Sequence, residues 1–155
     1  MNIDIGHSKN MHKHTERGNA VFTKNSLKEI ITRYQFAERH VLNKNILEIG
    51  PGTGFGSKNI INKSRDYTCI EYSIENINQL EKNYSDIKII NNDYTNLDKE
   101  ELKKLGTFDC IVSMANIYYF DFKKFVYISH KLLNPSGKII FCTTNKLHHS
   151  FIKSD

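Results

Sequence analysis

The stretch "ILEIGPGTGFG", residues 46–56, joins a short apolar run to a loop with four glycines in seven positions. Because glycine has no side chain, the backbone of such a loop turns sharply and lets another group come close. Three kinds of ligand compete for this loop: a nucleoside triphosphate, a dinucleotide pyrophosphate, or a ligand without phosphate. The residues around the loop distinguish between them.

Apolar, strand-like runs alternate with helical patterns on both sides of the loop. We expect strands at 45–50, 67–72, 87–93, 108–114 and 138–144, and helices at 26–41, 56–64, 74–84, 98–105 and 121–133. Ser26 and Glu29 match a capping box, which predicts that the first helix begins at Ser26. The sequence "NPSG", residues 134–137, predicts a turn.

Strands that alternate with helices pair in parallel through right-handed crossovers. The expected fold is therefore α/β, a three-layer α/β/α domain with a mainly parallel sheet. Residues 1–25 are expected to form a polar N-terminal arm, residues 26–144 the α/β domain, and residues 145–155 a C-terminal tail. We assign no metal site to the arm, although it carries His7, His12 and His14.

Composition excludes several classes of function. The net charge of +5 comes mostly from scattered lysines, and no segment interleaves arginine with aromatic residues, so we expect no nucleic-acid partner. No run approaches about 18 apolar residues and no secretory signal is visible, so we expect no membrane association and a cytoplasmic protein. Cys69, Cys110 and Cys142 lie in strand-like runs without metal-ligand spacing, which predicts buried thiols.

The loop itself excludes the first two ligands. A nucleoside-triphosphate loop needs G-x-x-x-x-G-K-[ST], but here Lys58 follows Ser57 in the reverse order. A dinucleotide loop needs G-x-G-x-x-G, and its third position is occupied by Phe55. The carboxylate of Glu48, just before the loop, would repel a pyrophosphate and would suit a ligand with a positive ammonium group.

An apolar strand, an acid and G-x-G-x-G in this order resemble the first motif of class I S-adenosylmethionine-dependent methyltransferases, which have a Rossmann-like fold. The resemblance extends over residues 26–144. It includes Glu71 after the second strand, Asp93 after the third, and the segment "LLNPSGKIIFCTT", residues 132–144, which matches the family's L-x-P-x-G turn and fifth strand.

The resemblance implies S-adenosylmethionine as the cofactor, with Glu71 on the ribose hydroxyls, Asp93 on the adenine amino group and Tyr94 packed on the adenine ring. The complete set of implied cofactor-binding residues is Glu48, Gly50, Pro51, Gly52, Thr53, Gly54, Glu71, Tyr72, Asn92, Asp93, Tyr94 and Ser113. Arg33 or Tyr34 is a candidate for the methionine carboxylate, with core packing as the alternative for Tyr34. No metal is implied.

The methyl acceptor is expected beyond the fourth strand, at "SMANIYYF", residues 113–120. This run lacks the [DNS]-P-P-[YF] motif of amino-methylating nucleic-acid enzymes, which favours a small-molecule or sugar-like acceptor. Asn116, Tyr118 and Tyr119 are candidate acceptor contacts, and aromatic packing explains the tyrosines equally well. Because the sulfonium carbon is already activated, positioning carries most of the catalysis, and we assign no catalytic residue, including His130, His148 and His149.

The resembled fold has seven strands, the last two forming a hairpin beside the fifth, whereas this chain ends at residue 155. We therefore expect a C-terminally truncated domain with residues 138–144 as an exposed edge strand. Pairing with a second copy, a partner chain, or an inactive gene product all stay open. The first hypothesis is a methyltransferase; the alternatives are a non-catalytic cofactor-binding remnant and, third, a nicotinamide-dependent oxidoreductase.

Overall fold

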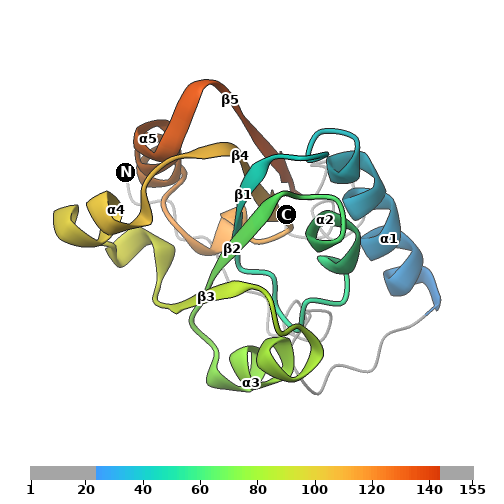
Figure 1. The fold of residues 1–155 in the computed structure, drawn as a ribbon. Coiled ribbons are helices and arrows are strands. Elements are labelled where there is room, and N and C mark those ends of the chain that lie inside the picture. Colours follow the sequence, from blue (N-terminus) through green and yellow to red (C-terminus); the bar gives the residue numbers. More distant parts are fainter. Residues whose placement is uncertain (1–23, 144–155) are drawn as a thin grey trace, which may run out of the picture.

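The computed structural model describes residues 24–143, which form one parallel sheet with helices on both faces (Figure 1). The strands are β1 (Asn45–Ile49), β2 (Asp66–Glu71), β3 (Lys88–Asn91), β4 (Phe108–Met114) and β5 (Leu133–Cys142). The helices are α1 (Lys24–Glu38), α2 (Lys58–Ile61), α3 (Ile74–Asn83), α4 (Lys99–Leu105) and α5 (Phe122–Leu132), with short 3-10 helices η2 (Tyr94–Asn96) and η3 (Ile117–Tyr119).

The strand order is β3-β2-β1-β4-β5, and all four pairs are parallel. The predicted α/β class and parallel sheet are confirmed. The chain runs outward from β1 to β3 and then returns to the other side of β1 at β4. The carboxyl end of β1 is thus the point where the strand order reverses, which is where open α/β sheets bind their ligands.

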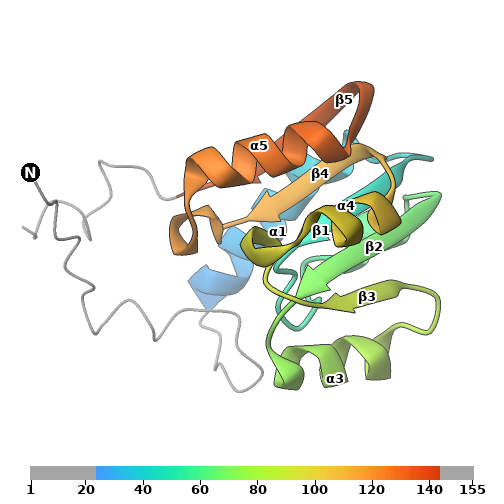
Figure 2. The ribbon, with the colours of Figure 1, turned by 90° about the vertical axis from the view of Figure 1, so that its left-hand side faces the viewer.

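Two apolar clusters, one on each face of the sheet, hold the layers together. Alternate residues of β1 point to opposite faces, so Ile46 enters the cluster under α1, α2 and α3, and Leu47 enters the cluster under α5. Figures 1 and 2 show α1 and α2 on one side of the sheet and α4 and α5 on the other. Burial on both faces explains why the strands are continuously apolar.

Two local predictions are wrong. The first helix begins at Lys24, so Ser26 lies inside α1, and the capping box of this chain is instead formed by Asp98 and Glu101 at the start of α4. Residues 134–137 do not separate α5 from β5 as a turn. Leu133 already pairs with Phe108 and Lys138 pairs with Cys110, so these four residues bulge out within β5.

The outer side of β5 is open among residues 24–143, where β4 is its only partner strand. A groove of about 380 Å³ lies beside it, lined by Phe36, His40 and residues 138–141. The expectation that a second copy or a partner chain covers this edge stays a prediction. Of the predicted arm only Lys24 and Asn25 are described, and they belong to α1. The predicted tail, residues 145–155, lies wholly outside the described residues.

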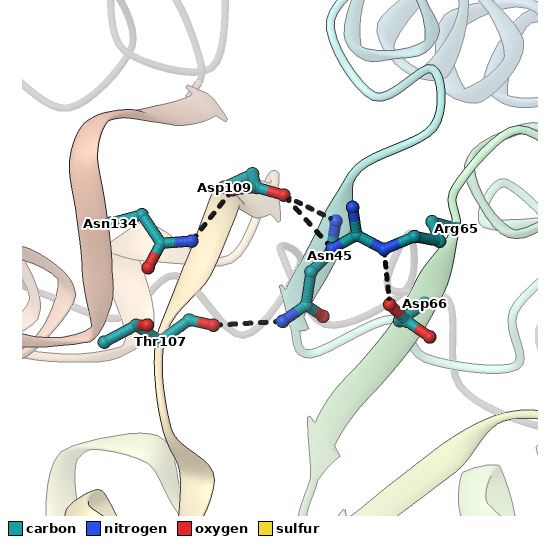
Figure 3. A network of polar contacts seen from close by, with 6 residues as sticks. All are labelled: Asn45, Arg65, Asp66, Thr107, Asp109 and Asn134. Carbon is teal, nitrogen blue, oxygen red and sulfur yellow. Dashed lines mark hydrogen bonds and ion pairs between the residues drawn. The ribbon is translucent and has the colours of Figure 1, made fainter.

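Asp109 joins three strands at the edge of the sheet opposite the glycine loop (Figure 3). Its Oδ2 accepts the backbone N–H of Asn45 at 2.9 Å, and its Oδ1 accepts the Asn134 amide at 2.8 Å. The Arg65 guanidinium lies 3.6 Å from Oδ2. The Asn45 N–H above all lowers the pKa of Asp109 below its usual value. Asp109 therefore ties β1, β4 and the bulge of β5 together.

We predict that Asp109→Ala lowers the free energy of unfolding by about 1–3 kcal/mol, because two hydrogen bonds to a charged acceptor are lost. Urea unfolding measures the change. Asp66→Ala is the control, because the Asp66 side chain pairs only with Arg65 on the surface and should contribute less than about 0.5 kcal/mol. Equal effects of the two substitutions would contradict the bridging role of Asp109.

Candidate cofactor site

The glycine loop, residues 50–56, continues β1 and turns back toward α2. The Gly50 N–H donates to the Ile70 carbonyl at 2.9 Å, which extends the pairing of β1 with β2 by one residue. Gly50, Gly52 and Gly54 have φ values of 63°, 62° and 77°. These left-handed conformations cost other residues roughly 1–2 kcal/mol each, so the glycines are required by the backbone path.

The last two glycines of the loop serve helix packing. A Cβ on Gly54 would overlap Leu80 and Tyr84 of the α3 region, and the Tyr84 hydroxyl donates to the Gly54 carbonyl at 2.8 Å. A Cβ on Gly56 would overlap the ring of Tyr34. The α3 region thus excludes a side chain at position 54, and the place of Gly54 in the cofactor set stays a prediction.

Glu71, at the end of β2, is bonded to the glycine loop. Its carboxylate is only 3% exposed. Oε2 accepts the Gly52 N–H at 3.1 Å, while Oε1 accepts the N–H groups of Tyr72 and Ser73 at 3.0 and 2.9 Å. The structure therefore brings two of the predicted site residues, Gly52 and Glu71, into direct contact.

The Glu48 side chain, in β1 just before the loop, was expected to face the ligand but points into the core. It is 0% exposed and points under α1, where Oε1 accepts the Tyr34 hydroxyl at 2.6 Å and Oε2 accepts the Tyr67 hydroxyl at 2.5 Å. Burial raises the pKa of Glu48, and the two tyrosine bonds oppose that shift. Glu48 is thus a buried structural carboxylate that does not face a ligand ammonium group, because the alternation of β1 directs it into the core.

The residues around Glu48 include Tyr34 of α1, which was a candidate for the methionine carboxylate together with Arg33. Tyr34 is a core residue. Arg33 is half-buried on α1, where its guanidinium lies 3.7 Å from the Glu29 carboxylate, and it stays a candidate for the methionine carboxylate. Tyr67 was not singled out from the sequence. The sequence carried no signal for this role, because Tyr67 shares a sheet face with Glu48 only through its register opposite Ile46 in β1, which the folded sheet sets. Burial raises the pKa of Tyr67, so its hydroxyl keeps its proton and donates.

The residues after β3 turn in opposite directions. Asp93 is exposed, and its Oδ1 accepts both the backbone N–H and the hydroxyl of Thr95 at 2.8 Å, which starts η2. Tyr94 is 3% exposed, its hydroxyl bonds Ser129 Oγ at 2.9 Å, and its ring lies 5.9 Å from that of Phe125. Tyr94 is therefore core under α5 and does not present its ring to a ligand, because the η2 turn directs it inward.

The remaining predicted residues are spread around the loop. Asn92 donates to Glu101 Oε1 at 2.7 Å, and the buried Ser113 hydroxyl donates to Oδ1 of Asn116. Tyr72 is exposed. Pro51 and Thr53 are buried within the loop.

Two exposed aromatic side chains stand beyond β4. Tyr118 and Tyr119 are 41% and 51% exposed, and their ring centroids are 4.6 Å apart. Partial burial raises the pKa of Tyr118 to about 12, so this hydroxyl is neutral at ordinary pH. The third residue of η3, Ile117, is buried, so the exposed surface of this short helix is formed by the two tyrosines.

Residues 24–143 contain neither a candidate metal cluster nor a candidate membrane-spanning helix. No group of three or more His, Cys, Asp or Glu side chains is placed to hold a metal ion there. None of the described helices is long and apolar enough to span a bilayer. The histidines at positions 7, 12, 14, 148 and 149 lie outside the described residues.

Comparison with known families decides the relationship. A family model described as a methyltransferase domain matches residues 21–153. The chain belongs to this methyltransferase domain family. The resemblance inferred from the glycine loop and the strand ends is thereby confirmed.

Individual relatives agree with this assignment. The ribosomal RNA small subunit methyltransferase A of Mesomycoplasma hyopneumoniae is 32% identical over 107 residues, which are 68% of this chain and 39% of that protein. The N-methyltransferase NodS from Bradyrhizobium japonicum WM9, solved with S-adenosyl-L-homocysteine, has a TM-score of 0.63 at 20% identity. The glycopeptide N-methyltransferase MtfA, solved with sinefungin, has a TM-score of 0.59 at 17% identity.

The two structural matches show the shared fold. The NodS match covers 77% of this chain and 62% of NodS, and the MtfA match covers 72% of this chain and 52% of MtfA. The chain therefore spans well under half of its curated relative and between half and two thirds of these methyltransferases.

We predict that Glu48→Gln changes how the stability of this methyltransferase domain depends on pH. The Glu48 carboxyl titrates near its ordinary pKa of 4.5 in the unfolded chain and at a raised pKa in the folded chain. Between these values the folded protein holds a proton that the unfolded chain releases. The stability from this group is thus present below the ordinary pKa and lost as pH rises through the raised one.

Urea unfolding of both proteins at several pH values measures this effect. The free energy of unfolding of the wild type, minus that of Glu48→Gln, should fall as pH rises. Glu100→Gln is the control for the loss of a surface carboxylate, because Glu100 is exposed on α4. A Glu48 difference that does not change with pH would show that burial does not govern this carboxyl.

Proposed function

We propose that the chain binds S-adenosylmethionine at the glycine loop and transfers its methyl group to a small-molecule or sugar-like acceptor. The observation that carries the proposal is the Glu71 carboxylate, buried at the carboxyl edge and bonded to Gly52 of the loop. Such a carboxylate can exchange the Gly52 N–H for ligand hydroxyl donors. Family membership and the solved relatives that hold S-adenosyl-L-homocysteine or sinefungin support the same cofactor.

Part of the residue set that the sequence implied fits this cofactor. Gly50, Pro51, Gly52 and Thr53 supply the loop, Glu71 accepts the ribose hydroxyls, and the exposed Asp93 is available to the adenine amino group. When bound, the cofactor supplies an activated methyl group. The task of the chain is then to hold the acceptor in line with that group and to exclude water. No acid–base residue is part of the proposal.

The small-molecule acceptor rests on two observations. Tyr118 and Tyr119 form an exposed aromatic surface beyond β4, and several proteins of similar structure are N-methyltransferases, among them coclaurine N-methyltransferase, which was solved with N-methylheliamine. We place the protein in the cytoplasm and residues 26–144 in the catalytic domain as parts of this proposal. The family match gives no support to the nicotinamide oxidoreductase alternative.

RNA is the second candidate acceptor. The curated relative at 32% identity is named as a ribosomal RNA methyltransferase, and the net charge of +5 suits a phosphate backbone. Incubation with radiolabelled S-adenosylmethionine distinguishes the candidates: label in a panel of small amines and amino sugars supports the first, and label in RNA supports the second. Cofactor binding without S-adenosylhomocysteine formation would support the non-catalytic alternative.

We predict that Glu71→Gln weakens S-adenosylhomocysteine binding by about tenfold to a hundredfold, because hydrogen bonds from ligand hydroxyls to a charged acceptor contribute about 1.5–3 kcal/mol. Calorimetric titration of the 155-residue chain measures the dissociation constant. NADH is the ligand control and should not bind.

Glu75→Gln is the matched control variant, because Glu75 is near Glu71 in sequence and its carboxylate lies on the surface, where it accepts the Ser73 hydroxyl. Its affinity for S-adenosylhomocysteine should equal that of the wild type. An unchanged affinity in Glu71→Gln would remove Glu71 from the site, and NADH binding would reopen the oxidoreductase alternative.

A further inference from the structure

We propose that Asn116 is a positioning residue that locks the glycine loop to the segment beyond β4. This inference rests on the proposed function, because it assigns the two joined segments to the cofactor and acceptor sides of one site. It gives Asn116 a role different from the acceptor contact considered from the sequence. The side chain acts through the backbone of the loop.

The amide of Asn116 spans the ends of β1 and β4. Its Nδ2 donates to the carbonyls of Ile49 and Gly50, and its Oδ1 accepts the hydroxyl of Ser113. A Cβ on Gly50 would overlap this Nδ2. The nitrogen and the oxygen of the amide are therefore both bonded within the protein, and the first glycine of the loop is required for the close approach.

The backbone beside Asn116 is strained in a way that supports a positioning role. Ala115 has φ = 57°, a left-handed conformation that is unfavourable for a residue with a Cβ. The Ala115 N–H donates to the Cys142 carbonyl at 3.1 Å, which fixes the turn to β5. Strained residues persist where the surrounding structure holds them, and they cluster at functional sites.

This turn sets the direction of η3, and with it the exposed rings of Tyr118 and Tyr119. Because Asn116 bonds the glycine loop from the same turn, a shift of either segment displaces the other. Methyl transfer depends on the alignment of two bound molecules, for which a displacement of about 1 Å is costly. Asn116 thus couples the positions of the cofactor loop and the acceptor-side aromatic pair.

Asn116→Asp is the sharpest test, because it keeps the shape of the side chain and replaces the N–H donors by an oxygen that faces two carbonyl oxygens. Two properties are measured on the 155-residue chain. Calorimetry gives the dissociation constant for S-adenosylhomocysteine. Hydrogen exchange followed by NMR gives the protection of the Gly50 N–H, which bonds the Ile70 carbonyl in the native loop.

We expect Asn116→Asp to weaken S-adenosylhomocysteine binding by about tenfold or more and to accelerate exchange at Gly50 while core strand amides stay protected. Ser113→Ala, which removes only the bond to Oδ1, should give smaller changes in the same direction. Asn78→Asp, on the exposed surface of α3, is the matched control and should change neither property.

The outcomes separate this proposal from the proposed function. If the wild type does not bind S-adenosylhomocysteine, the function is wrong, and Gly50 exchange alone decides whether Asn116 locks the loop. Unchanged binding and exchange in Asn116→Asp would overturn the positioning role. Uniformly faster exchange across all strands would also overturn it, because Asn116 would then support global stability only.

Discussion

The glycine loop at the end of β1 is the constraint on which the arrangement of this domain depends. Each of its glycines meets a different element: Gly50 meets Asn116 after β4, Gly52 meets Glu71 at the end of β2, Gly54 meets Tyr84 after α3, and Gly56 meets Tyr34 of α1. Three of these positions have positive φ values, so the backbone path and the close contacts both require glycine. The loop joins the ends of neighbouring strands to helices that pack beneath them.

The buried carboxylate of Glu48 links the strand that precedes the loop to helix α1. Transfer of an ionised carboxyl into an apolar core is costly unless hydrogen bonds satisfy both oxygens, and Glu48 obtains one from each of Tyr34 and Tyr67. Tyr34 reaches Glu48 across Gly56, where no side chain intervenes. The position of α1 is thus linked to the central strand by a specific polar contact as well as by apolar packing.

Periodicity predicted the parallel sheet, because it depends on patterns within short segments. The glycine spacing predicts a cofactor site at the carboxyl end of β1, and that assignment stays a prediction. The direction of individual side chains depended on partners from distant segments. Glu48 follows its strand face toward Tyr34 and Tyr67, and Tyr94 follows the η2 turn toward Ser129. Leu133 similarly began pairing before the predicted strand, because Phe108 offered it a partner and Asp109 held the bulge that follows.

The structure changes the physical argument against a phosphate ligand at the glycine loop. Glu48 was expected to repel a pyrophosphate, but it is buried away from the loop. Glu71 takes over that role, since its carboxylate already accepts the Gly52 N–H. In phosphate-binding loops such backbone N–H groups are donors to the anion. A phosphate here would have to displace a carboxylate and remain beside it, whereas a ligand with hydroxyl donors, and with positive charge elsewhere, gains from the same carboxylate. The bond to Glu71 therefore leaves the loop one free N–H fewer for a phosphate, while the same carboxylate offers an acceptor to a ligand with hydroxyl donors.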